Sequence, residues 1–138
     1  MKKWQTLRLN LIAPLLLLLL TVSLQAQPAR FNAAGVSYTV ELYTQANYPI
    51  ALDFAPDGRL FYTEKTTCSV RVINADGSLQ PEPVITLPTS ALVERGLLGI
   101  ALDPAYASNG MIWVLHTAEA TARDYAANRV VRFHEADG

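Results

Sequence analysis

The chain has 138 residues, of which 51% are hydrophobic, and it carries a net charge of −1 and one cysteine. The length suits one ordinary domain, and the slight acidic excess excludes the basic footprint expected of a nucleic-acid-binding protein. A single cysteine excludes an internal disulfide framework, so stability must come from a hydrophobic core or from further chain.

Residues 1–26 have the three parts of a secretory signal peptide: a basic start, an apolar run at residues 12–20, and a small and polar exit ending at Ala26. The run is shorter than the roughly 20 apolar residues of a membrane span, which disfavours the alternative of an uncleaved anchor. We expect cleavage after Ala26, a secreted or periplasmic product, and no membrane span after cleavage. Eight basic and twelve acidic residues then remain, giving a net charge of −4.

After a lead-in segment at residues 27–42, short strands alternate with turns, and no amphipathic stretch reaches the length of a helix. Proline, aspartate and glycine mark a turn at residues 56–58, and Asn-Ala-Asp-Gly marks another at residues 74–77. Apolar and β-branched runs between such turns predict seven strands. These are Ile50–Phe54, Leu60–Thr63, Ser69–Ile73, Pro83–Leu87, Leu97–Leu102, Met111–His116 and Asn128–Phe133.

The chain contains an internal repeat. The sequence Ile-Ala-Leu-Asp of Ile50–Asp53 recurs 50 positions later as Ile100–Asp103. Each copy is followed by a proline, a glycine turn, an apolar strand with an aromatic residue, and a strand that mixes valine with arginine. Each copy closes on Ala-Asp-Gly, and the second is longer because residues 118–127 form a small, polar insertion that predicts a loop.

A repeat of about 40–50 residues with about four strands is typical of a β-propeller blade. One antiparallel sandwich with chance similarity between its halves is the alternative, which four matched features in the same order disfavour. The sequence therefore predicts an all-β fold in which residues 43–138 are the N-terminal, incomplete part of a β-propeller domain. The first blade runs from about Tyr48 to Leu87, and the second begins near Gly96 and ends after its third strand.

Residues 94–104, Glu-Arg-Gly-Leu-Leu-Gly-Ile-Ala-Leu-Asp-Pro, resemble a signature of the PQQ-dependent sugar dehydrogenases, the glucose/sorbosone dehydrogenase family. Pro-Asp-Gly-Arg-Leu-Phe at residues 56–61 and Asn-Arg-Val-Val-Arg-Phe at residues 128–133 resemble flanking landmarks of the same family. The resemblance implies a six-bladed propeller, with pyrroloquinoline quinone (PQQ) and calcium bound by the full-length protein. It also implies oxidation of a sugar hydroxyl, with a histidine as base and hydride transfer to the quinone.

Glu94 is the one position in this stretch to which the resemblance assigns a substrate-binding role. Its position in the family faces the channel mouth near the substrate, so we expect its carboxylate to accept a hydrogen bond from a sugar hydroxyl. The alternative is an exposed loop acid, paired with Arg95 or free in water, which contributes little energy. Glucose-oxidising members carry glutamine at this position, so the resemblance does not single out glucose as the sugar.

No catalytic, cofactor-binding or metal-binding residue is assigned in this stretch, because the family's catalytic histidine and its PQQ and calcium residues fall later in the sequence. His116 and His134 are expected at the solvent edge or at strand ends without a catalytic role. Cys68 is expected to pack near a turn without chemistry.

The sequence and the resemblance leave three hypotheses about function. The first is the inactive N-terminal fragment of a secreted quinoprotein sugar dehydrogenase. The second is a propeller of the same lineage that binds carbohydrate or protein without the cofactor. A lactonase-like propeller with a metal cluster is disfavoured by the Gly-Leu-Leu-Gly segment at residues 96–99. The oligomeric state stays open.

Overall fold

A computed structural model describes residues 29–135, so the expected signal peptide lies outside the described residues. The chain divides into two units, one ending at Val40 and the other beginning at Glu41. No helix in the described range is long and apolar enough to cross a membrane.

The first unit contains an antiparallel hairpin of two strands, β1 (Ala29–Ala33) and β2 (Val36–Val40). Both residues of its two-residue turn have positive φ, 50° and 79°, and the second of them is Gly35. Positive φ at both positions is the conformation that favours tight hairpins. The rings of Phe31 and Tyr38, paired across the strands, stack with centroids 5.0 Å apart. The sequence did not predict this hairpin, because the first turn residue is an alanine and gives no turn signal.

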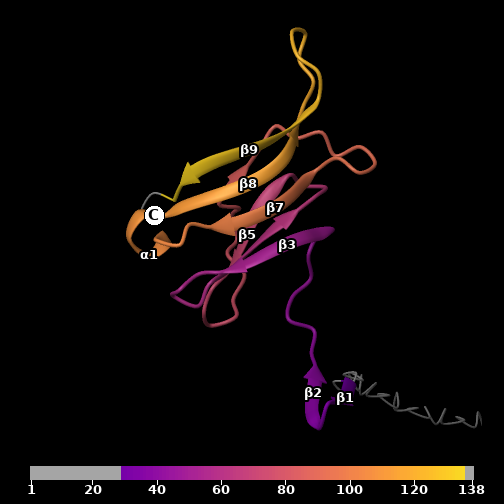
Figure 1. Ribbon diagram of the computed structural model, residues 1–138, viewed down its shortest axis with the longest axis vertical. Helices are drawn as coiled ribbons and strands as arrows, with labels where there is room; N and C mark the ends of the chain where they lie inside the picture. The colour runs from indigo at the N-terminus through magenta and orange to yellow at the C-terminus, as the bar shows by residue number, and fades with distance from the viewer. Residues whose placement is uncertain (1–28, 136–138) are drawn as a thin grey trace, which may run out of the picture. The chain divides into compact units, whose positions relative to one another are not determined.

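The second unit begins with a four-stranded antiparallel sheet in the order β3-β4-β5-β6, which we call blade 1 (Figure 1). Its strands lie where the sequence predicted them, although the last is shorter than expected because Pro83 has no N–H to donate to a neighbouring strand. The strands are β3 (Pro49–Phe54), β4 (Leu60–Glu64), β5 (Ser69–Ile73) and β6 (Ile85–Thr86).

A three-stranded antiparallel sheet in the order β7-β8-β9 follows, which we call blade 2. Residues 119–126 form the predicted loop, which projects beyond the sheet (Figure 1). A one-turn helix, too short to give a periodic sequence signal, precedes β8 and was not predicted. The elements are β7 (Leu97–Leu102), α1 (Tyr106–Asn109), β8 (Met111–Ala118) and β9 (Ala127–His134).

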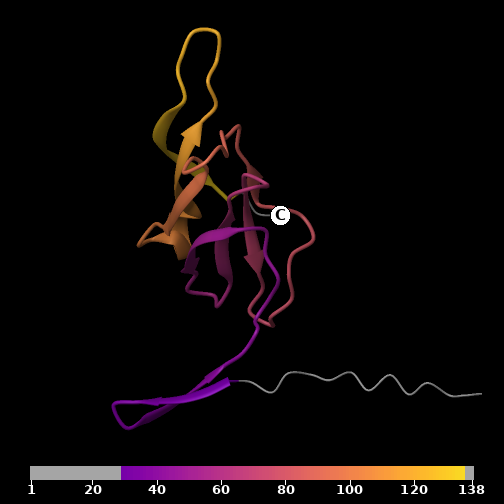
Figure 2. The ribbon, with the colours of Figure 1, turned by 90° about the vertical axis from the view of Figure 1, so that its right-hand side faces the viewer.

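The main hydrophobic core lies between the two blades, which face each other in Figure 2. Side chains alternate along β4, so Phe61 points into this core while Leu60 and Tyr62 pack with Ile73 on the other face of blade 1. Each blade thus buries one face of its sheet against the other blade. The buried core residues are Ala55, Phe61, Val70, Val72, Leu97, Tyr106, Ile112 and Val114.

Equivalent positions of the repeat differ in burial. Phe61 of β4 is fully buried between the blades, whereas Trp113, its counterpart in β8, is 38% exposed on the far face of blade 2. Leu115 and Val130 are exposed beside Trp113, and Phe54 is exposed on the far face of blade 1. Both outward faces of the pair of blades are therefore apolar, as expected of units that bury their faces only against neighbours.

Candidate functional site

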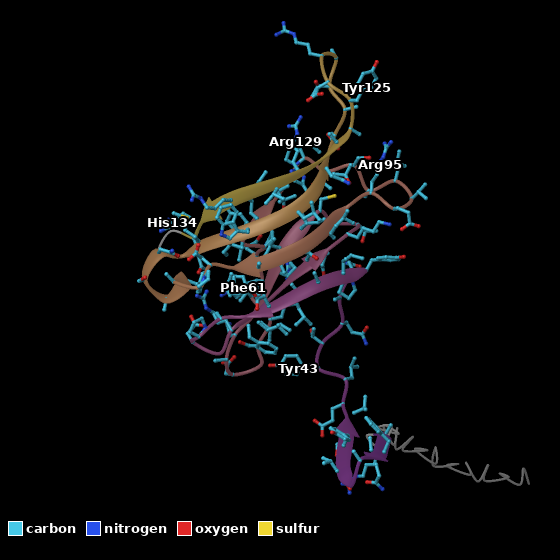
Figure 3. The ribbon with its side chains drawn as sticks, in the orientation of Figure 1. Tyr43, Phe61, Arg95, Tyr125, Arg129 and His134 are labelled. Atoms are coloured by element: carbon cyan, nitrogen blue, oxygen red, sulfur yellow. The ribbon has the colours of Figure 1, made fainter. Side chains whose placement is uncertain are left out.

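Loops of both blades gather at one end of the sheets, which we call the Glu94 end. It comprises the β4–β5 turn at residues 65–68, the connection between the blades at residues 87–96, and the β8–β9 loop at residues 119–126. Arg95 lies at this end in Figure 3, together with Tyr125. The topology thus gathers three loops from two blades around the one residue that the sequence assigned to substrate binding.

Backbone hydrogen bonds fix both ends of the connection between the blades. Near its start, Leu87 N donates to Cys68 O at 3.0 Å, and Ser90 N donates to Thr117 O at 2.9 Å. Near its end, Thr117 N donates to Gly96 O at 2.9 Å. The connection is therefore bonded to the β4–β5 turn on one side and to β8 on the other, and residues 91–95 lie between these anchors.

The tip of this connection is a tight turn that carries Glu94. Arg95 N donates to Leu92 O at 2.9 Å. Val93 has a φ of 52° and is 82% exposed, an uncommon conformation for a β-branched residue. Glu94 is exposed, and the ion pairs among residues 29–135 involve Arg59 and Arg129 rather than Arg95. The structure thus places the Glu94 carboxylate in solvent at a loop tip, without the ion pair to Arg95 considered from the sequence.

Lys65, the first residue after β4, contacts this tip, although nothing in the sequence pattern pointed to it. Its ammonium Nζ donates a hydrogen bond to the carbonyl of Val93 and lies 5.1 Å from the centre of the Tyr48 ring. Its aliphatic stem passes over Gly96, where a Cβ atom would lie 2.6 Å from Lys65 Cγ. A lysine directly after a strand, with a glycine beginning the next blade, gave too weak a signal to predict this contact.

His116 is a buried structural residue rather than the solvent-edge histidine expected from the sequence. Strand β8 continues for two residues beyond it, and the side chain is only 4% exposed. Its Nδ1 lies 2.9 Å from Thr89 Oγ1 in the connection between the blades. Burial, reinforced by the charge of Arg129, lowers the pKa of His116, so the ring is neutral at pH 7. His134, in contrast, is exposed at the end of β9, as expected.

Cys68 also anchors the connection. The residue has a φ of 56°, and its Sγ lies 3.4 Å from Thr89 O and 3.5 Å from Lys65 O. Burial, with a contribution from Glu119, raises the pKa of the thiol. A thiol with a raised pKa stays protonated and is a poor nucleophile. The contacts of Sγ agree with the expectation of a cysteine packed near a turn.

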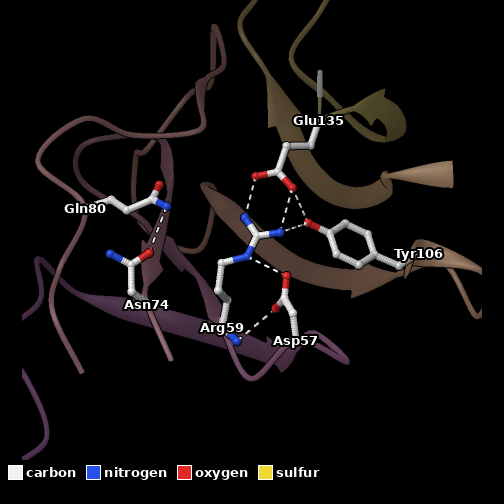
Figure 4. A network of polar contacts seen from close by, with 6 residues as sticks. All are labelled: Asp57, Arg59, Asn74, Gln80, Tyr106 and Glu135. Carbon is white, nitrogen blue, oxygen red and sulfur yellow. Dashed lines mark hydrogen bonds and ion pairs between the residues drawn. The ribbon is translucent and has the colours of Figure 1, made fainter. Parts of the chain in front are cut away.

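The opposite end of the sheets carries a network of charged side chains centred on Arg59, from the Pro-Asp-Gly-Arg turn (Figure 4). Arg59 Nη1 and Nη2 donate to the two carboxylate oxygens of Glu135 at 2.7 and 3.1 Å, and Nη2 also donates to the Tyr106 hydroxyl at 2.9 Å. Arg59 Nε donates to Asp57 Oδ2 at 2.9 Å. Arg59 therefore links blade 1 to both α1 and the residue that follows β9.

Burial alone would raise the pKa of Glu135, but hydrogen bonds from Arg59 and Tyr106 outweigh it and lower that pKa. The carboxylate is thus held ionised beside the guanidinium. Bidentate pairs of this kind are among the stronger hydrogen-bonded contacts in proteins. The sequence pattern predicted a turn at residues 56–58 and a family landmark at residues 56–61, but no structural role for Arg59. Arg59 instead joins the blades, at the end of the sheets away from Glu94.

Within the described residues, no cluster of three or more acidic, histidine or cysteine side chains is arranged around a common metal position. Two cationic side chains at the Glu94 end already have partners: Lys65 donates to Val93 O, and Arg129 pairs with Asp124. Within residues 29–135, the side chains at the Glu94 end therefore do not fit the ligand set that calcium and an anionic quinone would need.

Two antiparallel sheets in chain order, packed face to face and carrying a repeated sequence, define blades of a β-propeller. The profile described as glucose/sorbosone dehydrogenase matches residues 46–138. The chain belongs to the glucose/sorbosone dehydrogenase family. No curated protein sequence matches significantly.

Solved structures give the same assignment. The PQQ-bound aldose sugar dehydrogenase from Streptomyces coelicolor is 31% identical, with a TM-score of 0.55 over 64% of this chain and 25% of that one. A putative oxidoreductase (glucose dehydrogenase) from Thermus thermophilus is 28% identical, with a TM-score of 0.57 over 67% and 26%. The soluble aldose sugar dehydrogenase from Escherichia coli, solved in its apo form, is 25% identical, with a TM-score of 0.56 over 66% and 26%. The match thus spans about a quarter of the length of these relatives.

Proposed function

We propose that this chain forms the first blade and most of the second blade of an extracytoplasmic quinoprotein that oxidises a sugar hydroxyl, with PQQ as the hydride acceptor. The catalytic base and the residues that hold PQQ and calcium are then supplied by chain outside these 138 residues. The family match supports the sugar dehydrogenase class, and the basic-apolar-polar order of residues 1–26 supports export.

The observation that carries the proposal within this chain is the position of Glu94. The residue lies at the tip of a connection whose two ends are bonded to both blades, and its carboxylate is exposed. An ionised carboxylate accepts hydrogen bonds only, so its natural partners are donors such as sugar hydroxyls. We propose that Glu94 accepts a hydrogen bond from a hydroxyl of the bound sugar.

The test is an assay of the full-length protein that contains this sequence. The protein is incubated with PQQ and calcium, and reduction of an artificial electron-acceptor dye is followed with a panel of aldoses. Dye reduction that requires both PQQ and a sugar is the expected result. No reduction with any sugar would refute the dehydrogenase proposal. Retention of sugars in a direct binding assay without turnover would instead favour a propeller of this lineage that only binds carbohydrate.

A further inference from the structure

We propose that Lys65 is a positioning residue for Glu94: it holds the tip of the connection between the blades in one conformation and so fixes where the Glu94 carboxylate can meet a substrate. The inference rests on the proposed function of Glu94 as a sugar ligand. It adds a second residue, from a different loop, to the Glu94 end.

Val93, the residue directly before Glu94, has a strained backbone conformation. Its φ of 52° lies in the left-handed region, which is unfavourable for a β-branched side chain. Its side chain is 82% exposed, so packing of that side chain does not compensate for the strain. The ammonium of Lys65 binds its carbonyl directly. Strained backbone persists where surrounding contacts enforce it, and this charge-assisted hydrogen bond is such a contact.

Lys65 is itself held in place by contacts of its ammonium and of its stem. Its ammonium lies over the Tyr48 ring at 5.1 Å, within the range of a cation–π contact. Its stem occupies the space that a side chain at position 96 would need, since a Cβ there would lie 2.6 Å from Lys65 Cγ. Gly96 therefore leaves room for the lysine stem at the start of blade 2. Because both the stem and the ammonium of Lys65 are held, its hydrogen bond can keep the carbonyl of Val93 in one position.

The contacts of the Lys65 ammonium favour a positioning role over direct binding of the substrate. The ammonium has three donors, and it is engaged by Val93 O on one side and by the Tyr48 ring on another. The carbonyl carbon of Val93 is bonded directly to the backbone nitrogen of Glu94, so a shift of that carbonyl also shifts the Glu94 backbone. Removal of the ammonium should therefore act on substrate binding through Glu94 rather than by loss of a contact to the substrate.

The test is a double-mutant cycle in the full-length protein, assayed by sugar-dependent dye reduction. Lys65→Met keeps the stem and removes the ammonium, and it should raise KM for the preferred sugar about threefold to tenfold with kcat changed less than about twofold. In the Glu94→Ala background the same change should raise KM no further, because the residue it positions is gone. Arg123→Met, which removes an exposed cation from the β8–β9 loop at the same end, is the matched control and should leave KM unchanged.

A rise in KM of equal size in both backgrounds would overturn the proposal, because Lys65 would then act without Glu94. An unchanged KM in Lys65→Met would overturn it as well. Hydrogen exchange supplies a readout that needs no turnover: Lys65→Met should speed exchange at residues 93–96 while β4 and β5 keep their protection. If the protein oxidises no sugar, the proposed function fails, and unchanged exchange at residues 93–96 would separately refute the role of Lys65 in holding the tip.

Discussion

Asp53 Oδ2 accepts a hydrogen bond from the backbone N–H of Leu102 at 2.8 Å, although the two residues are 49 positions apart in the chain. Leu102 directly precedes Asp103, which is the counterpart of Asp53 in the repeated Ile-Ala-Leu-Asp sequence. The aspartate of one repeat therefore satisfies a backbone donor in the first strand of the next. The repeat that was visible in the sequence is thus also a set of contacts that fixes one blade against the other.

Replacement of Asp53 by alanine should destabilise the protein by about 1–2 kcal/mol, because the partly buried N–H of Leu102 loses its acceptor. Asparagine keeps an acceptor oxygen at the same position, and Asp53→Asn should cost less than about half as much. Denaturation by urea, with free energies of unfolding compared among the three proteins, measures both effects. Equal losses in the two variants would show that the charge of Asp53, rather than its hydrogen bond, is what matters.

Arg59→Met should lower the free energy of unfolding by about 1–3 kcal/mol, because it breaks a bidentate pair whose two side chains are only 23% and 24% exposed. Arg129→Met is the matched control: it breaks a pair whose side chains are 49% and 55% exposed, and it should cost less than about 1 kcal/mol. The same urea titration serves for both variants. A loss in Arg129→Met as large as that in Arg59→Met would contradict the proposed role of Arg59 in joining the blades.

His116 should make stability depend on pH. Its pKa is below the ordinary value of 6.5 in the folded state, so between pH 6.5 and the lower folded value the unfolded chain binds a proton that the folded chain does not. Stability should therefore fall as the pH is lowered below about 6.5. His116→Asn should show a smaller fall over this window. Above pH 7.5, where His116 is neutral in both states, the two proteins should have the same slope of stability against pH, and a difference there would point to another titrating group.

Glu94→Ala should raise KM for sugars by roughly threefold to tenfold, because a hydrogen bond to a charged acceptor is lost from substrate binding. Glu94→Gln keeps an acceptor and should shift the relative rates within a panel of aldoses rather than abolish oxidation. Glu82→Ala, which removes another exposed loop carboxylate, is the control and should leave KM unchanged. The dye-reduction assay gives all three results. An unchanged KM in Glu94→Ala would mean that Glu94 is only an exposed loop acid.

Residues 27–138 expressed alone should aggregate or remain largely unfolded. The outward faces of the two blades expose Trp113, Leu115 and Val130 on one side and Phe54 on the other. Exposed apolar surface of this kind needs a further covering element or promotes association. Size-exclusion chromatography with light scattering, followed by a thermal melt, measures both properties. A monomeric mass together with one cooperative transition would contradict this prediction.

Most of the blade structure could be predicted from the sequence, because short apolar strands between Pro, Asp and Gly turns leave a clear local pattern. Helix α1 and the hairpin at residues 29–40 were missed, since four helical residues show no period and the hairpin turn begins with alanine. The burial of His116 was also missed. It depends on Thr89 in the connection between the blades, a contact between residues 27 positions apart that no local pattern encodes.

Only the part of the candidate site that lies within the family signature could be predicted from the sequence. Glu94 lies within that signature, but Lys65 reaches the same tip from the other blade, and its carbonyl partner on Val93 has no sequence signal. The Arg59–Glu135 pair joins residues 76 positions apart and was likewise invisible in the sequence. Contacts between blades are set by how the sheets pack, so they become apparent only in three dimensions.

Because the core lies between the blades, the order of synthesis matters for how the chain folds. Phe61, Val70 and Val72 are made well before Leu97, Ile112 and Val114, the residues that cover them. A chain that emerges from its N-terminus, from the ribosome or through an export channel, therefore carries the apolar residues of blade 1 without their partners until blade 2 has followed. The sheet of blade 1 should become stable only once residues 97–114 have emerged to cover it, so folding of this chain should lag behind its synthesis or export by at least one blade.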